Sequence, residues 1–178
     1  MNIRNVGHSM KYEAECVAML FFPDEKIVTE EFPLTAPSPC AQEDCIENRL
    51  ENQVMRVTLY LNGEKTQLEQ AVPQNPTSPY EEAEFIMCDL MYRLLQKATG
   101  VSAAWGMLTG VRPVKLFHKR LDEGKTPQQT GEEFAKHFHV SREKIELALE
   151  TARHEAPILK EATDDTFSLY VSIPFCPS

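Results

Sequence analysis

The stretch Gln53-Val-Met-Arg-Val-Thr-Leu-Tyr-Leu61, Asn62-Gly63, Glu64-Lys-Thr-Gln-Leu-Glu-Gln-Ala-Val72 carries the clearest structural signal in the chain. Its first half is rich in strand-forming residues, and Asn-Gly accepts the positive φ angles of a type I′ turn, so the stretch predicts a β-hairpin. Alternate residues of the first strand point to opposite faces. One face is apolar and the other largely polar, which predicts a sheet covered on one side only. The apolar face is Val57, Leu59 and Leu61, and the opposite face is Arg56, Thr58 and Tyr60.

Weaker patterns precede the hairpin. They predict a strand at residues 1–7, a helix at 9–22 and a short strand at 26–31, followed by a proline-rich loop at 33–47. After the hairpin, a helix is expected at about 80–97. Ser78 can cap this helix, and Gly100 lies just past its end.

The last third of the chain is predicted to be helical. One helix is expected at 113–123, and Thr126 with Gln129 forms a capping box for the next. Ser141 caps a further helix, in which Pro157 should bend or end the last turns. The fold class predicted is α+β, with a small antiparallel sheet packed with helices and followed by a helical segment.

The bulk composition is that of an ordinary water-soluble protein. The chain has 178 residues, 42% hydrophobic and 25% charged, with a net charge of -9. A net negative charge argues against a nucleic-acid or anionic membrane surface. No stretch reaches the roughly 20 apolar residues of a membrane span.

Five cysteines occur, which is an odd number, and no secretion signal accompanies them. Free thiols in a reducing cytoplasm are therefore expected. Cys40 and Cys45 have a spacing that could suit a metal, but no second pair accompanies them. The five are Cys16, Cys40, Cys45, Cys88 and Cys176.

Histidine and arginine give further candidates. His137 and His139 could bind a metal, but a helix-terminus charge or plain surface is the simpler interpretation, and two-residue spacing places them on different helix faces. His118 and His154 are predicted to be solvated. Arg112 lies between a glycine turn and a helix start, where it could meet an anion, or it is simply a surface residue.

Residues 130–149 have a residue pattern typical of a helix-turn-helix, a unit that reads DNA with its second helix. Its basic residues are matched by acidic ones, on a chain whose net charge is -9. Helical hairpins show the same pattern for packing reasons alone. DNA binding stays an alternative that the charge disfavours.

The final residues are Tyr170-Val-Ser-Ile-Pro-Phe-Cys-Pro-Ser178. An apolar strand at 167–173 runs into a proline and then Cys176. A cysteine just past a strand end is well placed to hold a metal or cluster, since thiolates bind iron–sulfur clusters. A buried structural thiol is the other interpretation.

This ending resembles the start of the radical S-adenosylmethionine (radical SAM) signature, in which a strand feeds a loop carrying Cys-x3-Cys-x2-Cys. The sequence of residues 170–178 is similar to that of the oxygen-independent coproporphyrinogen III oxidase family, especially its coproporphyrinogen-dehydrogenase-like branch. The stretch Trp105-Gly-Met-Leu-Thr-Gly-Val-Arg-Pro-Val-Lys115 also resembles that branch.

The resemblance implies two parts. Residues 1–165 would be an N-terminal accessory α+β domain, and 166–178 the first strand of a radical SAM barrel that the chain leaves incomplete. In the parent enzyme, Cys176 would be a metal ligand and Tyr170 would lie against the cofactor. The implied cofactors are a 4Fe–4S cluster and S-adenosylmethionine, and the implied partners are the rest of the barrel and a porphyrinogen substrate.

The implied activity is the anaerobic oxidative decarboxylation of coproporphyrinogen III in haem biosynthesis. No catalytic residue and no bound cofactor are expected in this piece by itself. Oxidases of the family usually carry His where this chain has Ser172, so a haem-handling relative stays open. An interaction domain without chemistry is a further alternative.

Overall fold

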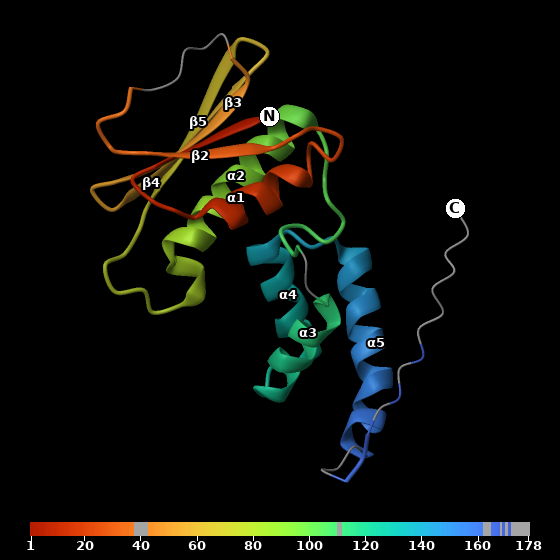
Figure 1. The fold of residues 1–178 in the computed structure, drawn as a ribbon. Helices are drawn as coiled ribbons and strands as arrows, with labels where there is room; N and C mark the ends of the chain where they lie inside the picture. The colour runs from red at the N-terminus through yellow and green to blue at the C-terminus, as the bar shows by residue number, and fades with distance from the viewer. Residues whose placement is uncertain (38–42, 110–111, 162–164, 168, 170, 172–178) are drawn as a thin grey trace.

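The hairpin stretch folds as two antiparallel strands at one edge of a five-stranded sheet (Figure 1). The computed structural model describes residues 1–37, 43–109, 112–161, 165–167, 169 and 171. The strands are β1 (Asn2–Val6), β2 (Val28–Phe32), β3 (Cys45–Glu51), β4 (Val54–Leu61) and β5 (Glu64–Ala71). The helices are α1 (Lys11–Met19), α2 (Ala83–Thr99), α3 (Pro113–Asp122), α4 (Pro127–Phe138) and α5 (Arg142–Glu161), with a 3-10 turn η1 (Pro79–Glu81).

The α+β class is confirmed, but the expectation of an antiparallel sheet is wrong in part. The strand order is β2-β1-β3-β4-β5, and β1 is parallel to both of its neighbours. The helix α1 crosses over between β1 and β2, and such a crossover joins parallel strands. Only β3, β4 and β5 pair in antiparallel fashion, so the sheet is mixed.

Strand β3 was predicted in part as loop. Its polar residues are buried, which hides the alternation that a half-buried strand normally shows. The Glu47 carboxylate lies 3.8 Å from Arg4 and 3.4 Å from Arg49. The amide of Asn48 donates to Asn5 on β1 at 3.0 Å. Burial of these polar groups is compatible with a stable sheet because they are paired with one another.

The predicted turn is confirmed, because Asn62 and Gly63 have φ angles of 54° and 79°. The expectation that one face of the sheet is uncovered is wrong at Thr58 and Tyr60, which are only 3% and 4% exposed. Part of the segment after β2 lies near this face, at Leu34 and Ala36. Arg49 holds it by donating to carbonyl oxygens of that segment at 3.0 and 3.2 Å.

Helices α1 and α2 lie along the other face of the sheet and complete the main core (Figure 1). Ser78 caps the turn before α2, as predicted, by accepting a hydrogen bond from the amide of Tyr80 at 3.2 Å. Gly100 ends α2 with a φ of 72°. The largest fully buried side chains of this core are Ile3, Ile46, Met55, Leu59, Ile86, Met87, Leu90, Met91, Tyr92 and Leu95.

Helices α3, α4 and α5 form a separate unit with a small core of its own, made of Phe117, Phe134, Val140 and Ala148. The capping box is confirmed, with both of its hydrogen bonds present at 2.9 and 3.2 Å. Helix α5 continues past Pro157 to Glu161, so the proline does not end the helix. Its ring removes one hydrogen bond near the exposed end, where water can replace that bond.

Within the described part of the chain, none of the helices is long and apolar enough to cross a membrane. Of the strand predicted at 167–173, only Phe167, Leu169 and Val171 are described. None of the three carries a strand assignment, and all are exposed.

Candidate functional site

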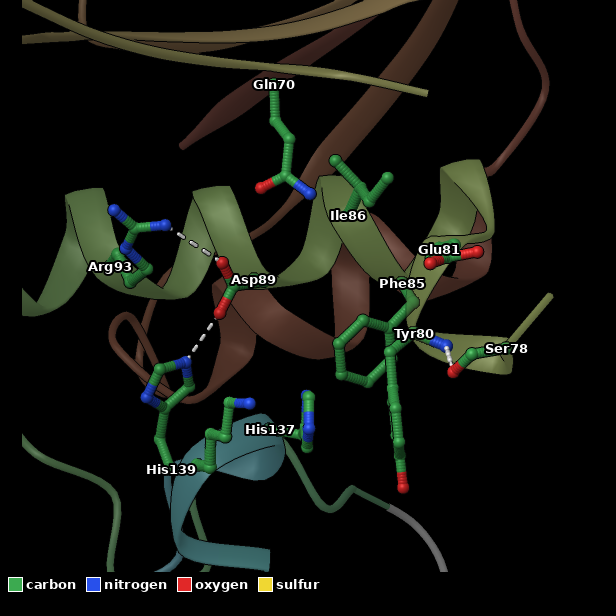
Figure 2. Close-up of a pocket in the computed structure, with 11 residues that line it drawn as sticks. Gln70, Ser78, Tyr80, Glu81, Phe85, Ile86, Asp89, Arg93, His137 and His139 are labelled. Carbon is green, nitrogen blue, oxygen red and sulfur yellow. Dashed lines mark hydrogen bonds and ion pairs between the residues drawn. The ribbon is translucent and has the colours of Figure 1, made fainter. Parts of the chain in front are cut away.

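A cleft of about 610 Å³ lies where the sheet-and-helix layer meets the helical unit (Figure 2). We call it the junction cleft. Its walls come from the end of β5, from η1, from α2 and from the end of α4. The lining residues are Gln70, Ser78, Tyr80, Glu81, Phe85, Ile86, Asp89, Arg93, Lys136, His137 and His139.

Asp89 of α2 is the main polar link across the cleft. One carboxylate oxygen lies 2.6 Å from the His139 Nε2, and the other accepts a hydrogen bond from Arg93 at 3.1 Å (Figure 2). Burial would raise the pKa of Asp89, but the hydrogen bonds from His139 and Arg93 outweigh it and lower that pKa. The His139 ring also stacks on Tyr92, with centroids 4.8 Å apart.

Tyr80 forms a second link. Its ring stacks on the His137 ring at 3.9 Å between centroids, with 7° between the planes. Its hydroxyl hydrogen-bonds to Glu133 of α4, which also accepts from Arg120 at 2.9 Å and pairs with Lys125. Burial, and then the hydrogen bond to Glu133, raises the pKa of Tyr80, so the phenol stays protonated at neutral pH.

The third link is backbone. The loop after α2 runs against the α4–α5 turn, where the Met107 amide donates to the Phe138 carbonyl at 2.8 Å and the Ser141 amide donates to the Ala104 carbonyl at 3.0 Å. Between these bonds, Gly106 has a φ of 57°, and a Cβ there would lie 1.8 Å from the Phe138 oxygen. Only glycine fits this contact.

The two histidines of the cleft were predicted to lie on different helix faces. They converge because α4 ends at Phe138 and His139 has a left-handed φ of 57°, which turns its side chain back toward α2. Burial, together with the charge of Lys136, lowers the pKa of His137. The interpretation of both as plain surface is wrong, since His139 pairs with Asp89 and His137 stacks on Tyr80.

Asp89, His139 and Tyr80 of the junction cleft make polar contacts that join the two cores. An Asp–His pair can hold a proton, but here the second carboxylate oxygen is taken by Arg93. In the described ranges, no group of three or more His, Cys, Asp or Glu residues could hold a metal ion. The arrangement therefore serves to fix the helical unit against the sheet layer.

Sequence reasoning missed Asp89, Tyr80 and Glu133. The i,i+4 spacing of Asp89 and Arg93 on a predicted helix was the one available signal, and it suggests a surface ion pair. Tyr80 and Glu133 bond to each other although they lie 53 residues apart in the chain, so no local pattern reveals this contact.

Of the two remaining histidine predictions, one is wrong and one is confirmed. His118 is not solvated, because its Nε2 lies 2.9 Å from Glu155 of α5 and its side chain is only 15% exposed. His154 is solvated as expected, with a side chain that is 68% exposed. Arg112 is exposed at the start of α3.

The helix-turn-helix candidate is a packed helical hairpin. Gly131 of α4 lies against Ile145 of α5, so closely that a Cβ at position 131 would be 3.0 Å from a methyl group of the isoleucine. The two arginines of α5 are paired, with Arg142 2.7 Å from Glu146 and Arg153 3.8 Å from Glu150. Paired charges leave little positive potential for phosphate contacts.

Tyr170, Ser172 and Cys176 lie outside the described residues, as does Cys40. Cys45 lies buried in β3, where burial raises its pKa to about 11. Burial likewise raises the pKa of Cys88 to about 12. Both thiols are therefore protonated at neutral pH, and a metal would have to displace those protons.

Comparison with known proteins gives one curated relative. The oxygen-independent coproporphyrinogen-III oxidase-like protein HemZ of Bacillus subtilis (strain 168) is 39% identical over 87 residues. The predicted family resemblance is confirmed. The match covers 48% of this chain but only 17% of that protein's length. No family model matches the chain, and no solved structure does.

Proposed function

We propose that residues 1–165 are the N-terminal accessory domain of a radical SAM coproporphyrinogen III oxidase-like protein, and that residues 166–178 begin its barrel. The observation that carries this proposal is the 39% identity to an oxidase-like protein of which the match covers only 17%. The sequence of residues 170–178 supports the proposal, because it places Cys176 shortly after the predicted apolar strand.

The described structure adds a physical argument. Phe167, Leu169 and Val171 are 91%, 81% and 72% exposed. Their period of two is that of one strand face. Three large exposed apolar side chains at this spacing favour pairing with further chain, since monomeric proteins rarely leave such a patch in water. A first barrel strand would be buried in this way.

In the parent protein, a 4Fe–4S cluster with S-adenosylmethionine would supply the radical that removes hydrogen from the propionates of coproporphyrinogen III, which would then lose carbon dioxide and pass one electron each to an external acceptor. The part of this chain assigned to that chemistry is small. Cys176 would be a thiolate ligand, and Tyr170 would lie beside the cofactor. Residues 1–165 would carry no catalytic group.

Reading the codons that follow Ser178 in the encoding gene tests this directly. We expect a cysteine four positions after Cys176 and another three positions beyond it. The 178-residue chain, treated anaerobically with iron and sulfide, should show no stable 4Fe–4S absorbance, whereas the parent protein should show it and lose it on Cys176→Ala. A stable cluster on the short chain would defeat the proposal.

Ser172 favours a second candidate within the same family. Where the oxidases usually carry His, a serine removes an imidazole beside the cofactor, which points to a haem-handling relative. Incubating the parent protein anaerobically with S-adenosylmethionine, coproporphyrinogen III, a low-potential reductant and an electron acceptor should yield protoporphyrinogen if it is an oxidase. A bound-haem absorption band after addition of haem, without decarboxylation, identifies the haem-handling relative instead.

A further inference from the structure

A second cleft, of about 710 Å³, lies between α3 and α5, which pack side by side (Figure 1). We call it the α3–α5 groove. One part of its wall is apolar, made by Pro113, Val114, Ile158 and Leu159. Its lining residues are Arg112, Pro113, Val114, Lys115, His118, Glu155, Ile158 and Leu159.

The apolar wall of the groove is exposed to water. Ile158 is 70% exposed and Leu159 is 57% exposed, although both belong to a regular helix. The helix ends two residues later, at Glu161, so the chain leaves the helical unit directly beside this wall. The next described apolar residues along the chain, Phe167 and Leu169, are exposed as well.

The rim of the groove is basic. Arg112 and Lys115 have no ion-pair partner among the residues that the structure describes, whereas His118 is engaged by Glu155 at 2.9 Å. The chain as a whole carries a net charge of -9, and these two cations lie within four residues of each other at one groove. A partner with carboxylates beside apolar side chains would match both the wall and the rim.

We infer that the α3–α5 groove docks the part of the same polypeptide that follows residue 178 in the parent protein, through apolar side chains flanked by carboxylates. This inference rests on the proposed function, which supplies the downstream domain. The match covers only 17% of the curated relative, so most of that protein lies outside the matched segment. A domain joined directly to the end of α5 reaches this groove without a long linker.

Hydrogen exchange of the 178-residue chain and of the parent protein tests the inference. Amides of residues 114–118 and 155–161 should exchange at least about tenfold more slowly in the parent, because docking removes them from water. Amides around the junction cleft should exchange alike in both proteins. Equal exchange of the groove amides in the two proteins would overturn the inference.

Substitution separates docking from simple helix stability. Ile158→Glu should leave the thermal midpoint of the 178-residue chain unchanged, because that side chain is already 70% exposed, and should speed proteolytic separation of the two parts of the parent. Leu147→Glu is the matched control, since Leu147 is 49% exposed on the same helix but does not line the groove. Equal effects of both substitutions in the parent would count against docking.

The charged rim has its own control. Arg112→Gln with Lys115→Gln should weaken docking in the parent in a salt-dependent way, whereas Lys119→Gln, exposed on the same helix and outside the groove, should not. The two proposals fail differently. A parent without cluster cysteines defeats the proposed function, whereas a cluster-bearing parent with an unprotected groove defeats only the docking.

Discussion

The sheet layer and the helical unit are stabilised in different ways. The sheet layer buries a continuous core between the strands and two helices, so its contacts are many and apolar. The helical unit buries only Phe117, Phe134, Val140 and Ala148, and it reaches the sheet layer through backbone bonds, stacked rings and ion pairs. A core this small contributes little stability alone. The helical unit should therefore depend on the junction, while the sheet layer should not.

Gly106→Ala should have the largest effect on this difference. The new Cβ would meet the Phe138 oxygen at 1.8 Å, at a φ of 57° that alanine disfavours. We expect a loss of about 4 kcal/mol or more from the helical unit. Urea unfolding followed by circular dichroism should then show two transitions, the first of them helical. Gly63→Ala is the control, because its φ is 79° but no atom lies within 4 Å, and it should cost about 1 kcal/mol.

Phe117→Ala should come next. Phe117 is fully buried and stacks on Phe134 at 4.0 Å between ring centroids. Emptying this site should cost about 3–4 kcal/mol, a large share of what so small a core can supply. We expect the helical unit to unfold first, whereas Leu90→Ala in the sheet layer should lower one transition common to the whole chain. Exchange of amides in α2 and in α4 distinguishes these outcomes. Loss of protection in α2 with Phe117→Ala would show that the two cores unfold together.

Local patterns predicted the parts of this molecule that depend on neighbours in sequence. The Asn62-Gly63 turn, the Thr126–Gln129 capping box and the helix ends follow from backbone preferences that act over a few residues. Strand β3 was not recognised, because Glu47 and Asn48 are buried by partners on other segments. The direction of β1 depends on how α1 crosses the sheet, which alternation cannot reveal.

The candidate site shows the same limit more sharply. The stretch around Trp105 carries the family resemblance, but only the structure shows that its Gly106 lets the loop touch the α4–α5 turn. His137 and His139 were selected as candidates, whereas their partners Tyr80 and Asp89 lie about 50 residues away in the chain. Polar contacts between elements that are distant in the chain leave no periodic pattern in the sequence, so only the packed structure reveals them.

Tyr80→Phe tests the polar part of the junction apart from its rings. The substitution removes the hydroxyl that bonds Glu133 but keeps the stack on His137. Glu133 retains Lys125 and Arg120, so the cost should be about 1–2 kcal/mol. Tyr80→Ala, which removes the ring as well, should cost more. If both substitutions cost the same in urea unfolding, the hydroxyl rather than the stack is what joins the units.

The smallest expected effect is that of pH on the junction. Burial and Lys136 lower the pKa of His137 below its ordinary value of 6.5, so the folded chain favours the neutral ring. The unfolded chain therefore binds the proton at higher pH than the folded chain does. This contribution to stability is fully present above about pH 6.5 and is lost as the pH falls through the lower, folded pKa. Burial lowers the pKa of His8 in the same direction, but His8 lies beside the sheet.

Two substitutions divide that pH dependence between the regions. His137→Gln should flatten the loss of stability between about pH 7 and pH 5 for the helical unit, and His8→Gln should do so for the sheet layer. The unfolding midpoint in urea, followed at several pH values, measures each slope. A slope for the helical unit that survives His137→Gln would assign the proton uptake to another group of that unit.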